Sequence, residues 1–309
     1  MVDSSSFCEV NGVVIEDTFA EAFPMVYSRL LVTADDEWWL KAACDASVGF
    51  ATSVIGCGVE AGVEYKTNDT PDGRPGAYLL FFTQSKKQME DQMVNRIGQA
   101  LMTCPTTAVF NAVESEEVMD IGSSIRYFGD GFQSSKVIEG KRYWRIPVME
   151  GEFVLEESFG RLDGIGGGNF LILAESSVAA LKAAKASVSA IDKIPGVIMP
   201  FPGGVVRSGS KVGSKYSFLK ASTNTEFCPT IRRQVNSLVP DGVNSIVEIV
   251  LDGVDVETVS KAMKVGIEAA CKVDSVEKIS AGNYGGDLGP FHFRLHDLLL
   301  GKASRVTKA

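Results

Sequence analysis

The chain has 309 residues, 45% of them apolar, and its 39 acidic and 30 basic side chains give a net charge of −9. This length and composition are typical of about two domains with sizeable cores. An acidic chain repels phosphate backbones and no long basic patch compensates, so nucleic-acid binding is disfavoured. Membrane spanning and export are disfavoured too, because no apolar run reaches the length of a membrane span and the N-terminus lacks a secretory signal. We therefore expect a cytoplasmic protein.

The first half of the chain predicts a strand, a helix, two strands, a second helix and a strand. Asp35 and Asp36 start the first helix, and Ser85 caps the second. The strands are expected at 29–33, 59–65, 77–83 and 125–129, and the helices at 35–48 and 85–102. The connecting segment 111–150 contains Gly-Asp-Gly and Glu-Gly turns, which indicate hairpins.

The second half predicts the same order of elements. Strands are expected at 169–173, 197–199, 245–251 and 276–280, helices at 176–191 and 255–272, and a last strand at about 291–296. The stretch that starts at Pro200 continues from the strand 197–199 as a glycine-rich loop.

The two halves also repeat each other in sequence. VIEDTF near residue 15 returns as VLEESF near 155, and PDGRPGAYLLFF at Pro71 returns as PDGVNSIVEIVL at Pro240. The order β-α-β-β-α-β, found twice, is that of the ferredoxin-like split βαβ unit. We predict an α+β fold of two ferredoxin-like lobes that form an internal repeat. Residues 1–150 make the first lobe with its connecting hairpins, and 151–309 make the second, with an insertion at about 200–235.

The strands 77–82 and 246–251 are apolar at odd and even positions alike. Helices cover only one face of a ferredoxin-like sheet, so something else must cover the other face. The other lobe or another subunit is the expected cover, and we predict an oligomer.

Glu248 is a carboxylate within the apolar strand SIVEIVL, where the repeat aligns it with Leu79. An ionised carboxylate is costly to bury unless it is paired. Desolvation should raise its pKa and keep it partly protonated near neutral pH, so that it can donate a proton or polarise a carbonyl group. The alternative interpretation is a buried ion pair with Arg207 or a lysine.

The stretch PFPGGVVRSGSKVGSK, from Pro200 to Lys215, combines glycines with three cations. It is not a phosphate-binding P-loop, because Lys211 is displaced by one residue from the motif and no helix follows. Arg207, Lys211 and Lys215 are candidate anion anchors, with the glycines permitting close backbone approach. The alternative is an interface loop that braces subunits.

Three other segments offer polar ligand-binding groups. GIGGGNF (164–170) precedes a strand rather than a helix, so it is no dinucleotide fingerprint, but Asn169 offers an amide beside its glycines. SAGNYGGDLG (280–289) offers Asn283 in the same way, and KASTN (220–224) offers Ser222. The alternative for the glycine-rich segments is a tight loop with a structural role.

Neither a metal site nor a catalytic triad is expected. His292 and His296 are the only histidines, and their spacing places both on one face of a strand or a helix without an evident third ligand. The six cysteines are scattered, with no CxxC pair, and are interpreted as reduced thiols. They are Cys8, Cys44, Cys57, Cys104, Cys228 and Cys271.

Over about residues 10–300 the chain resembles the formylmethanofuran–tetrahydromethanopterin N-formyltransferase family. The segments that carry the resemblance are NGVVIEDTFAEAF, TPDGRPG, RIGQALMTCPT, YFGDGFQ, WRIPVMEGEFVLEESFG, GGNF, PFPGGVVRSGSKVGSK, CPT, VEIV, VGIEAAC and KISAGNYGGDLG. The resemblance implies reversible formyl transfer between the amine of methanofuran, or an analogue, and N5 of tetrahydromethanopterin. It implies no prosthetic group and no catalytic metal, and it assigns the family's catalytic glutamate to Glu248.

The resemblance also implies a context for the reaction. It implies a homotetramer, built as a dimer of dimers, with the active site in a cleft at a subunit interface. The carriers are anionic, so Arg207, Lys211 and Lys215 would anchor their tails. The pathway is methanogenesis or formaldehyde oxidation, and in the latter the enzyme is a subunit of a formyltransferase/hydrolase complex. An alternative is a non-catalytic, carrier-binding scaffold subunit of such a complex.

Overall fold

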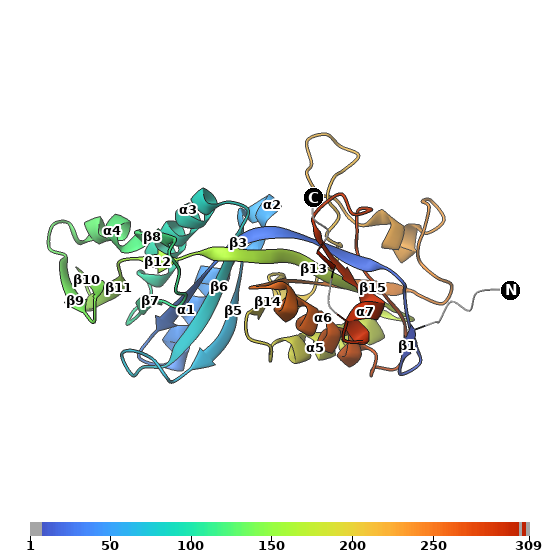
Figure 1. Ribbon diagram of the computed structural model, residues 1–309, viewed down its shortest axis with the longest axis horizontal. Helices are drawn as coiled ribbons and strands as arrows, with labels where there is room; N and C mark the ends of the chain where they lie inside the picture. The colour runs from blue at the N-terminus through green and yellow to red at the C-terminus, as the bar shows by residue number, and fades with distance from the viewer. Residues whose placement is uncertain (1–7, 303–304, 307–309) are drawn as a thin grey trace. The chain divides into compact units, whose positions relative to one another are not determined.

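The computed structural model describes residues 8–302 and 305–306 and consists of two compact units (Figure 1). Among the described residues, unit 1 combines residues 8–24 with those from Ile165 onward, and unit 2 comprises Met25–Gly164. The expected boundary near residue 150 assigned the N-terminal segment to the first lobe. The segment instead packs in unit 1, because β2 (Val13–Ile15) pairs in parallel with β16 (Val276–Ser280). The N-terminal residues 1–7, on which the expectation about export depends, lie outside the described residues.

Unit 2 is built on the sheet β5-β6-β3-β7-β11-β10-β9, whose only parallel pairing among the described strands is that of β7 with β11. Its strands are β3 (Phe19–Thr33, shared with unit 1), β4 (Thr52–Ser53), β5 (Val59–Thr67), β6 (Gly76–Thr83), β7 (Ala108–Asn111), β8 (Val118–Met119), β9 (Ser134–Ile138), β10 (Lys141–Pro147), β11 (Glu152–Glu156) and β12 (Phe159–Gly160). Its helices are α1 (Glu37–Val48), α2 (Val54–Cys57), α3 (Lys86–Arg96), the π-helix η1 (Ile97–Leu101), α4 (Ile121–Ile125) and the 3-10 helix η2 (Arg126–Gly129).

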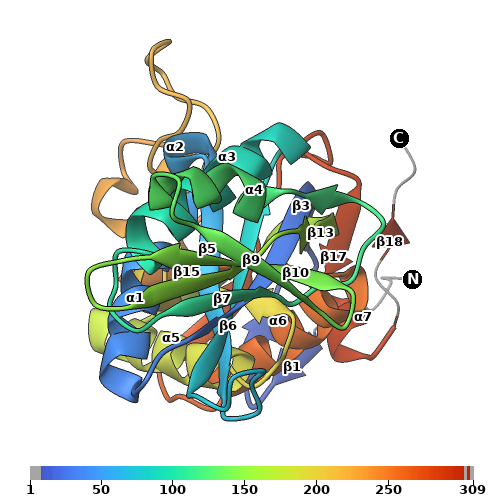
Figure 2. The same ribbon diagram turned by 90° about the vertical axis from the view of Figure 1, so that its left-hand side faces the viewer.

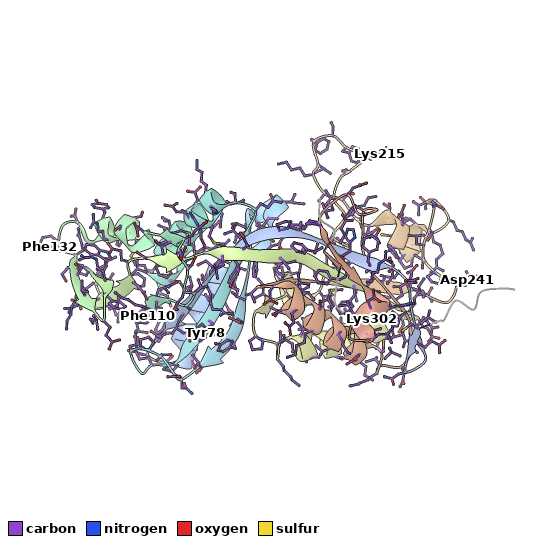
Figure 3. The ribbon with its side chains drawn as sticks, in the orientation of Figure 1. Tyr78, Phe110, Phe132, Lys215, Asp241 and Lys302 are labelled. Carbon is purple, nitrogen blue, oxygen red and sulfur yellow. The ribbon has the colours of Figure 1, made fainter. Side chains whose placement is uncertain are left out.

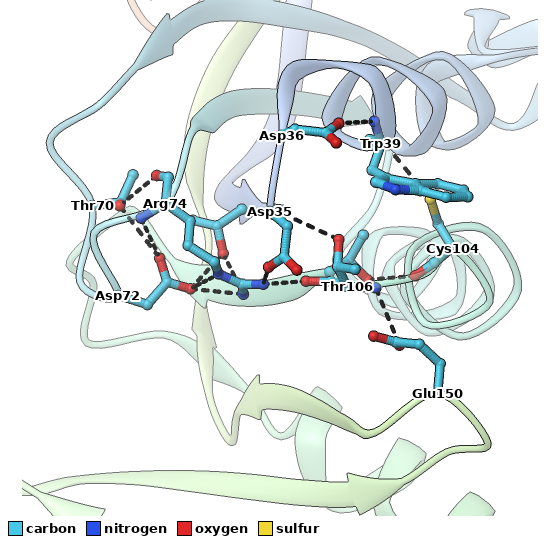
Figure 4. Close-up of polar contacts among 11 residues, drawn as sticks. Asp35, Asp36, Trp39, Thr70, Asp72, Arg74, Cys104, Thr106 and Glu150 are labelled. Carbon is cyan, nitrogen blue, oxygen red and sulfur yellow. Dashed lines mark hydrogen bonds and ion pairs between the residues drawn. The ribbon is translucent and has the colours of Figure 1, made fainter.

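Local sequence explains the starts of the two long helices of unit 2. The side chain of Asp36 accepts hydrogen bonds from the backbone of Trp38 and Trp39, and that of Ser85 accepts one from Gln88, as capping predicts. Beside the first cap, the guanidinium of Arg74 contacts Asp35 at 3.0 Å and Asp72 at 2.8 Å (Figure 4). Arg74 therefore ties the β5–β6 turn to the start of α1.

One predicted strand of the first half is wrong. Residues 125–129 are helical, because Ile121 and Ile125, four residues apart, are both buried on one side of α4. The last strand of the repeat unit is instead β7, which pairs with β3. The predicted hairpin at Glu139-Gly140 is confirmed: both residues have positive φ, as a two-residue β-turn requires, and β9 and β10 lie side by side (Figure 2).

Unit 1 contains the sheet β14-β15-β13-β16-β2-β1, with α5 and α6 packed together on one face (Figure 1). Its strands are β1 (Cys8–Val10), β2, β13 (Leu162–Ala174, starting in unit 2), β14 (Val197–Ile198), β15 (Ser245–Gly253), β16, β17 (Phe291–Arg294) and β18 (Arg305–Val306). Its helices are α5 (Ser177–Ile191), α6 (Val256–Ala270), α7 (Leu295–Leu299) and the 3-10 turns η3 (Pro202–Gly204), η4 (Thr225–Phe227) and η5 (Pro229–Ile231). The long elements follow the predicted order.

The second face of the unit 1 sheet is covered from within the unit. Residues 199–244, here called the insertion, connect β14 to β15, and Phe227, Val239 and Val243 from it pack against Leu171 and Leu173 of β13. The expectation that the other lobe or another subunit covers this face is therefore wrong for unit 1. Packing of these apolar side chains against the sheet removes both surfaces from water, which holds the insertion over this face.

The position equivalent to Glu248 in the repeat is Tyr78, not Leu79. Leu31 lies five residues before the cap Asp36 and pairs with Tyr78, whereas Leu171 lies five residues before the cap Ser176 and pairs with Glu248. Side chains alternate between the two faces of a strand, so a shift of one residue exchanges the faces. Glu248 consequently points away from the helices, toward the insertion.

None of the described helices is both long and apolar enough to cross a membrane.

Candidate active site

Glu248 lies in the middle of β15 with only 2% of its surface exposed. Ser210 of the insertion is its hydrogen-bond partner and donates twice: the backbone N–H to Oε2 at 2.7 Å and the hydroxyl to Oε1 at 2.6 Å. No arginine or lysine of the described chain forms an ion pair with the carboxyl group, so the alternative of a buried ion pair with Arg207 is not what the structure contains. A polar loop residue supports the group instead of a cation.

The loop that carries Ser210 is attached to the strand of Glu248 by its own backbone. Val206 and Glu248 exchange backbone hydrogen bonds at 2.8 and 3.2 Å, and Gly209 then adopts a left-handed conformation with φ 74°. This conformation is open to glycine at little cost. A Cβ on Gly209 would also lie 2.6 Å from the Cβ of Asn224, so the turn before Ser210 requires a glycine for space as well.

Burial raises the pKa of Glu248 from 4.5 to about 7, and the two hydrogen bonds from Ser210 lower it only in part. Desolvation disfavours the charged form, while donors to the carboxylate favour it. Near neutral pH the group therefore exists in both protonation states. A carboxyl group of this kind is able to donate a proton or a hydrogen bond to an oxygen that gains negative charge.

A small empty space lies beside the carboxyl group of Glu248. A cavity of about 30 Å³, the size of a single water molecule, is lined by Glu248, Arg207, Asn224 and neighbouring residues. Next to Oε1 lies Gly282, where an added Cβ would be 3.6 Å from Oε1 and 3.2 Å from Oδ1 of Asn169. The missing side chain of Gly282 thus leaves room for about a methyl group beside Oε1.

Asn169 fixes the position of Gly282 beside Oε1. It lies on β13 on the same face as Glu248, is 5% exposed, and bonds Gly282 from both ends of its amide: Gly282 N–H donates to Oδ1 at 2.6 Å and Nδ2 donates to Gly282 O at 3.1 Å. Nδ2 also donates to the carbonyl of Gly167. Its amide is therefore engaged by backbone groups next to the carboxyl group of Glu248.

Sequence reasoning missed two functional candidates, Tyr284 in the loop 281–290 and Glu21 on β3, which binds that loop. The hydroxyl of Tyr284 contacts the backbone on both sides of Lys211, and the buried carboxylate of Glu21 accepts backbone hydrogen bonds from Tyr284, Gly286, Leu288 and Gly289. Although burial favours the neutral form, these four donors hold the pKa of Glu21 below its usual value. Both residues stand in segments of the family resemblance, but no local pattern links them to Glu248.

The remaining candidates from the sequence lie at different distances from Glu248 along the insertion. Arg207 is exposed and lines the small cavity, and Lys211 is half-buried, with its ammonium 3.4 Å from the hydroxyl of Thr225. Lys215 is exposed in the loop that projects from the body of unit 1 (Figure 3). Ser222 donates to the carbonyl of Gly213 at 2.8 Å and closes the base of that loop. The structure thus places Arg207 at the same small cavity as Glu248 and Lys215 on the projecting loop.

Asn283 and the two histidines have structural contacts. Asn283 donates to Thr18 and to the carbonyl of Phe19, which fastens the loop 281–290 to β3. His292 lies on β17 and His296 on α7, so the expectation that they share one face of one element is wrong: the strand ends at Arg294 and a helix begins. Within the described part of the chain, no group of three acidic, histidine or cysteine side chains is arranged to hold a metal ion.

Comparison with known proteins gives matches along nearly the whole chain. Residues 8–148 match the family model described as formylmethanofuran-tetrahydromethanopterin formyltransferase, and residues 151–298 match the model described as its proximal lobe. The formyltransferase of that name from Methylococcus capsulatus is 53% identical over 295 residues, which cover 94% of this chain and 99% of that protein.

Two solved structures resemble the fold closely. The formyltransferase from Methanosarcina barkeri has a TM-score of 0.89 at 49% identity, covering 94% of this chain and 100% of its own. A chain of the formyltransferase/hydrolase complex from Methylorubrum extorquens, solved with methylofuran, has a TM-score of 0.91 at 44% identity, covering 94% and 98%.

The raised pKa of Glu248 predicts how stability depends on pH. The neutral form is favoured in the folded protein, so the stabilisation is complete below pH 4.5 and is lost as the pH rises through about 7. The free energy of unfolding of the wild type should therefore fall by up to about 3 kcal/mol relative to Glu248→Gln over this range. Denaturant unfolding of both proteins from pH 4 to 8 measures the difference. Parallel pH curves would contradict the raised pKa, and a wild-type curve that rises with pH would indicate an ion pair.

Proposed function

Because the chain belongs to the formylmethanofuran–tetrahydromethanopterin formyltransferase family, we propose that it transfers a formyl group reversibly between methanofuran, or an analogue, and N5 of tetrahydromethanopterin. The chain spans nearly the full length of its relatives and has both family segments, so the assignment concerns the whole enzyme. The carriers serve as co-substrates, and the proposal includes no prosthetic group.

Transfer of a formyl group from an amide to an amine proceeds through a tetrahedral adduct. N5 attacks the formyl carbon and gives up its proton, the carbonyl oxygen becomes an oxyanion, and the C–N bond to the first carrier breaks as its nitrogen receives a proton. We propose direct transfer in a ternary complex, with neutral Glu248 donating a hydrogen bond from Oε1 to the oxyanion. The observation that carries this role is a buried carboxyl group, with a pKa of about 7 and no cationic partner, whose Oε1 lies beside a residue without a side chain, Gly282.

The cations of the insertion are proposed to anchor the anionic tails of the carriers. Arg207 lines the cavity at Glu248, and Lys215 lies on the projecting loop, so the two are placed for the near and far parts of an extended ligand. Lys211 lies between them in the chain. Asn169, Ser222 and Asn283 are proposed to shape the site through their backbone contacts rather than as direct ligands.

The proposal also covers the oligomeric state of the protein, its partner complex and its cellular location. A homo-oligomer, arranged as a dimer of dimers, is proposed from the family resemblance. A formyltransferase/hydrolase complex is supported by the likeness to the chain from Methylorubrum extorquens. Work in the cytoplasm is supported by six free thiols.

Replacement of Glu248 by glutamine tests the catalytic role. The amide keeps the size of the side chain and is able to bond Ser210, but it is a weaker donor to an oxyanion and cannot transfer the proton. We expect kcat to fall by on the order of a hundredfold, with KM for both carriers nearly unchanged. Steady-state kinetics of formyl transfer, followed by the ultraviolet absorbance of the pterin, measures this. Near-normal turnover with normal carrier binding would remove Glu248 from the mechanism, and no transfer by the wild type in either direction would favour a carrier-binding scaffold.

Gly282→Ala tests the direction of approach to Oε1. The added methyl group meets only the 3.2 and 3.6 Å contacts given above, so the fold should tolerate it, while the space beside Oε1 is lost. We expect kcat/KM to fall on the order of tenfold or more. Gly98→Ala is the matched control, because a Cβ there meets nothing within 4 Å. An equally active Gly282→Ala enzyme would mean that the formyl group reaches Glu248 from another side.

Neutralising Lys211 and Lys215 together tests the anchoring role. Loss of two charge-assisted contacts should raise KM for at least one carrier by roughly five- to tenfold with little change in kcat. The double variant of the exposed lysines Lys182 and Lys185 on α5 is the matched control. A fall in kcat alone, or dissociation of the oligomer in size-exclusion chromatography, would instead identify the loop as a subunit brace.

A further inference from the structure

The hydroxyl group of Tyr284 fixes the loop that supports Glu248. It donates a hydrogen bond to the backbone carbonyl of Ser210 at 2.9 Å and accepts one from the backbone N–H of Val212 at 2.8 Å. A single hydroxyl therefore bridges the chain directly after the residue whose N–H and side chain hold the carboxyl group. Tyr284 is a half-buried side chain of another loop, so this contact is a tertiary one.

The position of Tyr284 is itself set by buried groups. Its backbone N–H donates to Oε2 of Glu21 at 2.8 Å, and three further N–H groups of the same loop donate to that carboxylate. Asn169 holds Gly282, two residues before Tyr284, by the reciprocal amide contacts described above. The loop 281–290 is thus tied to two strands, and Tyr284 extends from it toward the loop of Ser210.

The loop of Ser210 needs such a support. Its last sheet-like contact with β15 is at Val206, and the left-handed Gly209 follows before Ser210 is reached. Glycine gives this turn more conformational freedom than any other residue does. Beyond Gly209 the N–H of Ser222 bonds the carbonyl of Lys211 at 3.1 Å within the insertion itself, and the hydroxyl of Tyr284 adds a tie from this part of the insertion to a different segment.

We propose that Tyr284 is a positioning residue for Glu248, acting through Ser210, and this inference rests on the proposed catalytic role of Glu248. The N–H of Ser210 can only donate, so Oε2 must serve as its acceptor, whereas the Ser210 hydroxyl at Oε1 is able to accept as well as to donate; the proton of the neutral acid therefore resides on Oε1. Oε1 is the oxygen beside Gly282, where no side chain covers it. Tyr284 thereby determines which oxygen carries the proton that faces the formyl group.

Tyr284→Phe tests this, because it keeps the ring and removes only the hydroxyl group. We expect kcat to fall on the order of tenfold with KM unchanged within about twofold, as for a small misplacement of a catalytic group. The pH at which kcat declines should also move upward, since weaker donation from Ser210 favours the neutral acid. Tyr127→Phe, the same change at an exposed position of unit 2, should leave both quantities unchanged.

Two further measurements make the test specific. Ser210→Ala, which removes the hydroxyl donor directly, should move the same pH midpoint upward. In a Glu248→Gln background, Tyr284→Phe should cause no further loss, because two residues that act through one group are not additive. Thermal unfolding of each variant checks that the fold is kept.

The outcomes separate the inference from the proposal that it rests on. If Glu248→Gln alone is fully active, the catalytic role fails and the positioning role with it. If Glu248→Gln is impaired but Tyr284→Phe keeps normal kcat and pH midpoint, only the positioning role is overturned. It is also overturned if the losses from Tyr284→Phe and Glu248→Gln multiply, because Tyr284 would then act on a carrier directly.

Discussion

The site depends on the cost of burying one carboxyl group. Glu248 stands between apolar neighbours in its strand, and the sheet covers it from one side while the insertion covers it from the other. Water cannot solvate the charge there, so the protein must either supply donors or keep the group neutral. It does both in part: Ser210 donates twice, and the pKa still rises to about 7. That compromise allows the group to act as an acid near neutral pH.

Two loops and one strand segment meet at this group, and each loop is fastened to a neighbouring strand. The insertion is attached at Val206, the glycine-rich part of β13 presents Asn169, and the loop 281–290 is held by Glu21. Glu21 illustrates the opposite solution to the same problem. Four backbone donors keep its carboxylate charged and structural, whereas Glu248 has only one residue as its donor.

The two units share one order of helices and strands but have different roles. Both place a long strand, a capped helix and a central apolar strand in the same order, as the sequence pattern predicted. At the position of Glu248, unit 2 has Tyr78, and its connection between β5 and β6 spans only residues 68–75. Without an insertion nothing in unit 2 covers this position in the way that residues 199–244 cover Glu248. The polar site therefore belongs to the copy with the insertion.

The sequence by itself determined the long elements, the repeat and the anomaly of Glu248, because helix caps, apolar strands and a charge among apolar neighbours are local signals. Local signals did not determine the face of Glu248, which the Pro-Asp-Gly alignment misplaced by one residue, since only strand pairing fixes register. Nor did they show that residues 125–129 are helical or that the insertion covers the second face of its sheet. The roles of Ser210, Tyr284 and Glu21 were decided by the tertiary structure alone. The hydrogen bonds of these residues join partners whose sequence separations are 38, 74 and more than 260 positions. No sequence period encodes a hydrogen bond over such a separation.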